Sequence, residues 1–305
     1  MIVLGLLLAL ALVPQLVGAT GGRPAARVAR RIPPAAATVL LTGFALTVSL
    51  ATGMMLCLAA FLGTVELFPF AHPSDWSAGT LRARIPVPSA AGLAAGALVV
   101  GLLGRAGLHL VRVVVSARRA SAAVAALPAV GELAVVDDPA PHAYAVAGRH
   151  RRVVVSTGML RSLTGPQRRA LLAHEHAHLR HHHHRYTRLA WLAAAANPLL
   201  TPVARAVDQA AERWADAVAV RAVGDPATVA HALGRAALAG PPSPHGLGAA
   251  GHDVVDRIRD LLEPPRRQAS AGVLVGAAAV VCWASTAAVL FHTYNVIEFA
   301  ETVVG

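Results

Sequence analysis

The chain has 305 residues, of which 55% are hydrophobic and only 14% are charged. Soluble domains carry about 25% charged residues, so this composition excludes an ordinary soluble protein and indicates a membrane protein. The formal net charge is +11, and every basic residue is an arginine. Because arginines that flank membrane spans bind an anionic leaflet, the charge predicts contact with the lipid bilayer and no direct nucleic-acid binding.

Four stretches of the chain contain no charged residue, and each is longer than the roughly 18 residues that suggest a membrane span. The sequence therefore predicts about four transmembrane helices. The first stretch has no basic residue before its apolar run, which favours a retained anchor over a cleaved signal peptide. The four stretches are residues 1–22, 35–65, 85–104 and 268–297.

The arginines predict how these spans are oriented, because basic residues are enriched in cytoplasmic loops. Four of them follow the first stretch and four follow the third, so both segments should be cytosolic. We expect a multi-pass plasma-membrane protein with its N-terminus outside. Its predicted parts are three N-terminal spans with short loops in 1–115, a cytosolic domain in 116–267, and a C-terminal span with a short outer tail in 268–305.

Residues 105–127 have a helical pattern and are expected to continue the third span into the cytosol. Strand signals follow: a short apolar run at 133–136, then two runs at 142–147 and 152–156 that flank a turn. A small sheet is therefore expected, which makes the cytosolic domain α+β within a mainly α protein.

The next helix has a clear start signal and carries the most informative motif of the chain. Thr164-Gly165-Pro166-Gln167 fits a capping box with proline in the first turn. Inside this helix, His174-Glu175-His176-Ala177-His178 has the form H-E-x-x-H. Two histidines four residues apart lie on one helix face and can share one Zn²⁺, with the glutamate placed to act on a water.

Downstream of the motif the chain is expected to stay helical. The apolar segment 189–204 is only 16 residues long and contains Asn197-Pro198 and Pro202, so it predicts a helix broken by a turn and no membrane span. Two further helices are expected at 201–223 and 227–239, followed by a linker at 240–244. Residues 253–262 form an amphipathic helix that is expected to dock on the domain or on the membrane surface.

A catalytic zinc needs a third protein ligand, which must come from another helix. Asp208, Glu212 and Asp216 recur every four residues, and an ordinary acidic stripe would explain this spacing. The helix is otherwise apolar, however, and acids in such a helix need partners. We therefore expect Glu212 to be the ligand and Asp216 to accept a hydrogen bond from a zinc-bound histidine, with Asp208 as an alternative ligand.

Other histidines need a separate interpretation. His176 points away from the face of the two ligands and is not expected to bind the metal. The run from His181 to His184 is expected to be a polar helix end, whose cationic histidines suit the helix dipole, with adventitious or regulatory metal binding as the alternative. The residue that stabilises the oxyanion is not readable, and His231 and Tyr186 are two open candidates.

Residues 171–178 and the segment Glu212-Arg213-Trp214-Ala215-Asp216 resemble the membrane zinc metallopeptidases that carry H-E-x-x-H and E-x-x-x-D. The arrangement of three spans, a cytosolic zincin-like domain and one more span resembles the BlaR/MecR-type antirepressor peptidases. The heat-shock and prenyl-protein membrane proteases share the motifs, but they place spans between them, and only 33 residues separate His178 from Glu212 here. The antirepressor proteins also carry an extracellular penicillin-binding domain, and this chain has no S-x-x-K serine motif.

This resemblance implies a zinc metalloendopeptidase in which Glu175 is the general base, with His174, His178 and Glu212 as zinc ligands. The expected partner is a cytosolic protein substrate, and the antirepressor resemblance suggests a winged-helix transcriptional repressor. Two alternatives stay open: a protease for membrane-protein quality control, and a catalytically silent membrane receptor. The receptor is disfavoured because Glu175 and Glu212 are both present.

Overall fold

The computed structural model describes residues 2–65, 67, 85–239, 249–263 and 269–302. The expected linker at 240–244 and the loop between the second and third spans lie mostly outside these residues. The described fold is mainly helical with one small sheet. Four long helices dominate it: α1 (Ile2–Arg31), α2 (Pro34–Thr64), α4 (Ser89–Ala125) and α11 (Ala269–Thr302).

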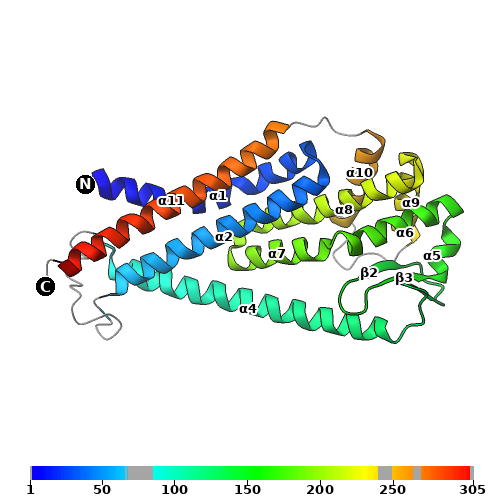
Figure 1. Cartoon of the computed structure of the whole chain (residues 1–305), viewed down its shortest axis with the longest axis horizontal. Coiled ribbons are helices and arrows are strands. Elements are labelled where there is room, and N and C mark those ends of the chain that lie inside the picture. Colours follow the sequence, from blue (N-terminus) through cyan, green and yellow to red (C-terminus); the bar gives the residue numbers. More distant parts are fainter. Residues whose placement is uncertain (1, 66, 68–84, 240–248, 264–268, 303–305) are drawn as a thin grey trace.

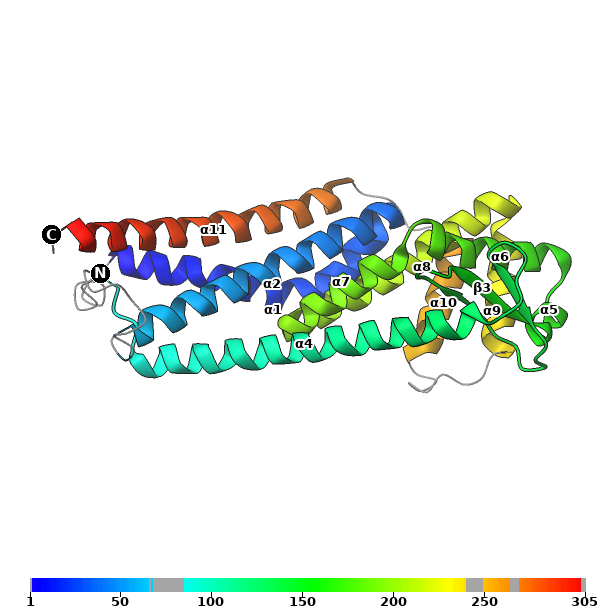
Figure 2. The same ribbon diagram turned by 60° about the horizontal axis from the view of Figure 1, so that its bottom comes forward.

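The long helices run along the molecule, and the sheet with the shorter helices gathers at one end (Figures 1 and 2). Both ends of the described chain lie at the opposite end of the molecule. Contacts join α2 to α4, α1 to α11 and α11 to α2, so these helices form one bundle. The bundle and the sheet end are connected by α4 and by two shorter helices that pack against α2.

Within the described part of the chain, three helices are long and apolar enough to cross a membrane. They contain Pro34–Thr64, Ser89–Ala125 and Ser270–Glu298, which correspond to the second, third and fourth predicted spans. In α1 the apolar part found among the described residues is only Ala9–Thr20, which is shorter than a span requires. The predicted first span thus remains a prediction, while the other three are supported.

The helix α4 shows how the membrane and the sheet end are related. Its 37 residues extend about 56 Å at 1.5 Å per residue, whereas the hydrocarbon layer is about 30 Å thick. Its first half exposes large apolar side chains such as Leu93, Leu98 and Leu103, as a lipid-facing helix does. The helix also continues past residue 105, as the sequence predicts, and its last turns reach the sheet.

Close packing fixes where α4 begins against α2. A Cβ atom added to Gly63 would lie 2.6 Å from the Cα of Gly92, and the reverse substitution meets Gly63 at the same distance. Only glycine allows the two backbones to approach this closely, which is a common way of packing membrane helices. The crossing point is at the end of the bundle that is remote from the sheet.

The sheet has three strands in the order β1-β3-β2. β1 (Leu133–Val136) pairs in parallel with β3 (Arg152–Ser156), and β2 (Ala143–Val146) pairs antiparallel with β3. The apolar run and the hairpin predicted from the sequence are both confirmed. β3 is central, and its Val153, Val154 and Val155 are fully buried, while one edge of β2 stays unpaired among the described residues.

Six helices and a 3-10 turn complete the sheet end. The capping box at Thr164 is present, with Gln167 accepting from the Thr164 backbone, so the predicted start of α6 is confirmed. The predicted break at Asn197 and the helix at 201–223 are also confirmed. The elements are α5 (Thr157–Ser162), α6 (Gly165–Arg180), α7 (His183–Ala196), η2 (Pro198–Leu200), α8 (Thr201–Val223), α9 (Pro226–Ala239) and α10 (Ala249–Leu262).

The pairing of α6 with α8 is the part of the fold that positions the candidate site. Small residues let the two helices approach closely, because Ala170 and Ala177 on α6 and Ala215 and Ala219 on α8 are all buried. The polar side chains of both helices then face each other across the contact. α10 lies against α8 and α9 and was predicted as a docked or membrane-surface helix; it docks on the domain.

Candidate metal centre

The two histidines of the H-E-x-x-H motif converge from consecutive turns of α6. The Nε2 atoms of His174 and His178 are 3.1 Å apart, and the two rings are inclined by 68°. Both side chains are mostly buried, with exposed fractions of 13% and 21%. The helix therefore presents two imidazole nitrogens to one point, as the spacing of the motif predicts.

Glu212 completes this group from α8. Its Oε2 atom is 3.5 Å from Nε2 of His174, and its Oε1 atom is 3.5 Å from Nε2 of His178. One ligand atom from each of the three residues lies within 4.8 Å of the others. The pKa of Glu212 is well below its usual range because Arg257 and the two histidines outweigh the effect of burial. The carboxylate is therefore ionised at neutral pH.

His174 is oriented by a carboxylate from the next turn of α8. Its Nδ1 atom is 3.0 Å from Oδ1 of Asp216, which is buried. Burial alone would lower the pKa of His174, but the hydrogen bonds to Asp216 and Glu212 raise it to about 10. Since Nδ1 donates to a carboxylate, Nε2 is the nitrogen that is left for a metal, as in other carboxylate–histidine pairs.

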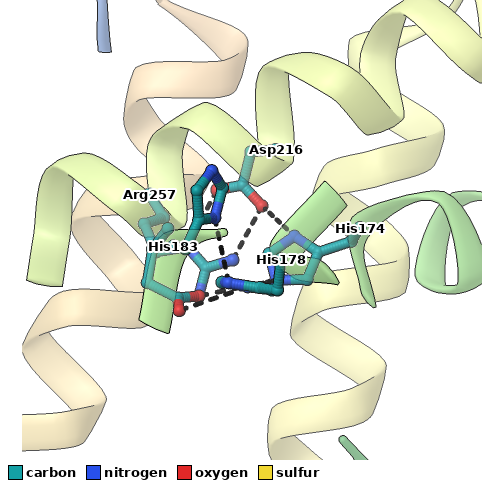
Figure 3. A network of polar contacts seen from close by, with 6 residues as sticks. His174, His178, His183, Asp216 and Arg257 are labelled. Carbon is teal, nitrogen blue, oxygen red and sulfur yellow. Dashed lines mark hydrogen bonds and ion pairs between the residues drawn. The ribbon is translucent and has the colours of Figure 1, made fainter. Parts of the chain in front are cut away.

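His178 is oriented by another histidine. Its Nδ1 atom is 3.0 Å from Nδ1 of His183, the first residue of α7 (Figure 3). Burial lowers the pKa of His178, and burial together with the neighbouring histidines lowers the pKa of His183 to about 3. Both rings are neutral at pH 7. If Nδ1 of His178 donates and Nδ1 of His183 accepts, then Nε2 of His178 is available for a metal.

The run from His181 to His184 thus differs from its predicted role. α6 ends at Arg180, and His182 adopts a left-handed conformation with φ of 54°. This break turns His183 back towards the motif, where it is buried against Trp214. The run does begin where α6 ends, as predicted, but burial lowers the pKa of His181, His183 and His184, which acts against the expected cationic forms.

Like His183, Arg257 has a role at the site that the sequence did not reveal. It comes from α10 and donates to both oxygens of Asp216, at 2.8 Å from Nε and 2.7 Å from Nη2. Its Nη1 atom is 2.9 Å from Oε2 of Glu212. Figure 3 shows Asp216 between Arg257 and His174. The only sequence signal was a basic residue beside the apolar stripe of the helix at 253–262.

Glu175 lies beside the three converging side chains and faces a cavity. Burial raises its pKa, although the positive charges of His174 and Arg257 and a backbone hydrogen bond from Ala145 act in the opposite direction. The cavity has a volume of about 780 Å³ and extends from the motif to α4 and β2. Ala143 to Ala147 line one wall, so the unpaired edge of β2 borders the space in front of Glu175.

The other histidines and acids singled out in the sequence lie elsewhere. Asp208 accepts a hydrogen bond from Nε1 of Trp191 at 2.8 Å and does not belong to the three-residue group. His176 contacts the carbonyl of Leu172 in its own helix. Neither candidate for oxyanion stabilisation, His231 or Tyr186, lines the two cavities that contain Glu175.

The distances between the three side chains fit a zinc ion. Ligand atoms that lie about 2.1 Å from one ion in tetrahedral geometry are about 3.4 Å apart, close to the 3.1 and 3.5 Å found here. Two imidazoles and one carboxylate are also a donor set typical of catalytic zinc, which keeps a fourth position open. The residues present therefore fit the metal that the motif predicts.

The three converging side chains form a site that could hold a metal ion. Residues 112–192 match the model of Peptidase family M48, a family of zinc metallopeptidases. This segment includes His174, Glu175 and His178, and it supports a peptidase; Glu212 and Asp216 lie beyond it. No curated protein and no solved structure matches the chain significantly.

Proposed function

We propose that this protein is a membrane-embedded zinc metalloendopeptidase that hydrolyses peptide bonds of a protein on the cytosolic side. The observation that carries the proposal is the convergence of His174, His178 and Glu212 with Glu175 beside them. Two helices that are far apart in sequence supply these side chains. The match to a peptidase family supports the same conclusion independently of the geometry.

The side chains divide the chemistry between them. His174, His178 and Glu212 would hold a zinc ion, which would supply a Lewis acid able to acidify a water and polarise the scissile carbonyl. Glu175 takes the proton of the attacking water and delivers it to the leaving amine. Burial raises its pKa, which makes the carboxylate a better proton acceptor.

The substrate is proposed to lie along the free edge of β2. An unpaired strand edge offers backbone donors and acceptors to an extended peptide. Residues 143–147 line the cavity in front of Glu175, so a chain added there runs past the metal ligands. An extended segment of a folded or partly unfolded protein is the kind of substrate that this geometry accommodates.

The proposed location of the site follows from α4. His109 lies 20 residues after Ser89, so α4 has risen roughly 30 Å when it reaches the cavity, which is the thickness of the hydrocarbon layer. We place the centre at the cytosolic membrane surface, with the N-terminus outside. The arginines after the first and third stretches support this orientation.

We further propose that the substrate is a transcriptional repressor, as for the antirepressor peptidases that the sequence resembles. Residues 179–211 are all described, and they form the end of α6, α7, η2 and the start of α8, none of which is a candidate span. The finding that no candidate span lies between the two zinc motifs supports the arrangement of the antirepressor peptidases that the sequence resembles. A quality-control protease is the alternative that the following experiment separates.

The test compares the wild-type protein with Glu175→Ala in cells and in detergent. The variant should bind zinc as the wild type does, while cleavage falls by roughly 10²- to 10⁴-fold because proton transfer is lost. Unchanged cleavage would refute the assignment. Protein N-termini across the proteome then identify the substrate: one clipped repressor supports signalling, and many clipped membrane proteins support quality control.

A further inference from the structure

Arg257 is bound to two acidic side chains that stand one turn apart on α8. All three of its nitrogens are used, Nε and Nη2 by Asp216 and Nη1 by Glu212. Its side chain is only 13% exposed. A guanidinium presents a rigid planar fork that fits carboxylates in this way, and an ammonium does not.

Each of the two carboxylates that Arg257 contacts has a second partner at the metal centre. Asp216 also accepts from Nδ1 of His174, and Glu212 also faces Nε2 of both histidines. A carboxylate has two oxygens and about four lone-pair directions, so each can serve the guanidinium and the centre together. Arg257 therefore fixes the rotamer of one ligand directly and that of His174 through Asp216.

The charges at the centre give an independent reason for a cation at this position. Glu175, Glu212 and Asp216 are three acidic side chains in a mostly buried place, and a divalent metal balances two of them. Buried charges that lack compensation are costly. Arg257 supplies the third positive charge, so the loaded site is neutral with Arg257 and carries a net charge of −1 without it.

The backbone that carries Arg257 is held at both ends of α10. Near its start, Oδ1 of Asp253 accepts from Nε2 of Gln209 at 2.9 Å. Near its end, Asp260 is 2.5 Å from Nη2 of Arg30 and 3.6 Å from Nη1 of Arg213. These contacts place the guanidinium against α8 without help from a substrate.

From this geometry we propose that Arg257 is a positioning residue that holds Glu212 and Asp216 in the arrangement required to bind the metal. The inference rests on the proposed zinc centre and adds to it a group from outside both zinc motifs. Arg257 is not a catalytic residue, since its three nitrogens are all engaged by Glu212 and Asp216.

The experiment measures zinc affinity of the full-length protein in detergent by competition with a chelator. Arg257→Ala should lower the affinity by roughly 10- to 100-fold, the usual effect of removing a group behind a metal ligand. Guanidinium ions at millimolar concentration should restore part of it. Arg259→Ala is the matched control, because Arg259 lies on the same helix, is exposed and pairs with Asp256, away from the metal centre.

A second variant keeps the test decisive if Arg257→Ala folds poorly. Arg257→Lys retains the charge but not the planar fork, so its zinc affinity should fall less than that of the alanine variant. The visible spectrum of the Co²⁺-loaded protein should change in Arg257→Lys and not in Arg259→Ala, which a general loss of stability would not produce.

The proposal is overturned if the Arg257 variants bind zinc within about twofold of the wild type, or more tightly. Tighter binding would mean that Arg257 competes with the metal for Glu212. Failure of the proposed function looks different: a wild-type protein that binds zinc, loses it in His174→Ala, but cleaves no protein. In that case the zinc affinities still decide the role of Arg257. A wild type that binds no zinc refutes both.

Discussion

His174 and His178 stand one turn apart on α6 and face the same point, but the groups behind them are of different kinds. Behind His174 lies a buried carboxylate, Asp216, which is itself held by Arg257. Behind His178 lies a neutral imidazole, His183, at the start of a new helix. Both arrangements leave Nε2 for the metal. A charged partner and an uncharged partner can thus fix the same tautomer, but only the charged one makes the ligand more basic.

The largest expected effect on zinc affinity comes from Asp216, the charged partner of His174. Asp216→Asn keeps the size of the side chain but removes the charge that His174 and Arg257 share. Zinc affinity should fall by roughly 10- to 100-fold. Chelator competition measures it, with Glu132→Gln as a control because Glu132 forms an exposed ion pair with Arg151 in the sheet region. Wild-type affinity in Asp216→Asn would show that the carboxylate does not support the ligand.

A smaller effect on zinc affinity is expected from His183, the neutral partner of His178. His183→Phe removes the acceptor behind Nδ1 of His178 and should lower zinc affinity by about 10-fold, the lower end of the range for such partners. His183→Asn offers an oxygen near the same place and should retain most of the affinity. Equal losses in the two variants would mean that His183 acts through packing against Trp214 and not through its hydrogen bond.

The smallest effect is expected at Asp208, which faces the cavity but lies outside the ligand group. Burial raises its pKa to about 6, although the hydrogen bond from Trp191 acts against this shift. The folded state thus holds this proton more tightly than the unfolded state, and its contribution to stability is lost as pH rises from about 4 through 6.

Asp208→Asn keeps an acceptor for Trp191 and has no charge to bury. The variant should therefore melt at a higher temperature than the wild type at about pH 8, and the difference should vanish near pH 4. Thermal unfolding in detergent measures both values. Zinc affinity should not change; a clear loss would instead make Asp208 a ligand and contradict the assignment of Glu212.

The groups behind His174 and His178 also differ in how far they could be predicted from the sequence. Glu212 and Asp216 were predicted because they repeat every four residues on an otherwise apolar helix, a pattern visible within one element. The capping box and the strands were local signals of the same kind. Predicting the role of Asp216 requires no knowledge of the fold beyond the packing of α8 on α6.

His183 and Arg257 depend on tertiary structure that no local pattern contains. A continuous helix through His181–His184 would place His183 on a different face, and only the left-handed residue His182 turns it inward. Arg257 lies on a separate helix whose charges suit a solvated face equally well.

Because Arg257 lies on α10, the metal centre can be complete only after α10 has been synthesised. A ribosome adds about 5–20 residues per second, so the 41 residues from Asp216 to Arg257 take roughly 2 to 8 seconds. During that interval the nascent chain already contains every zinc ligand but lacks the cation that neutralises them. The order of the helices thus delays completion of the proposed metal centre until α10 has emerged and docked.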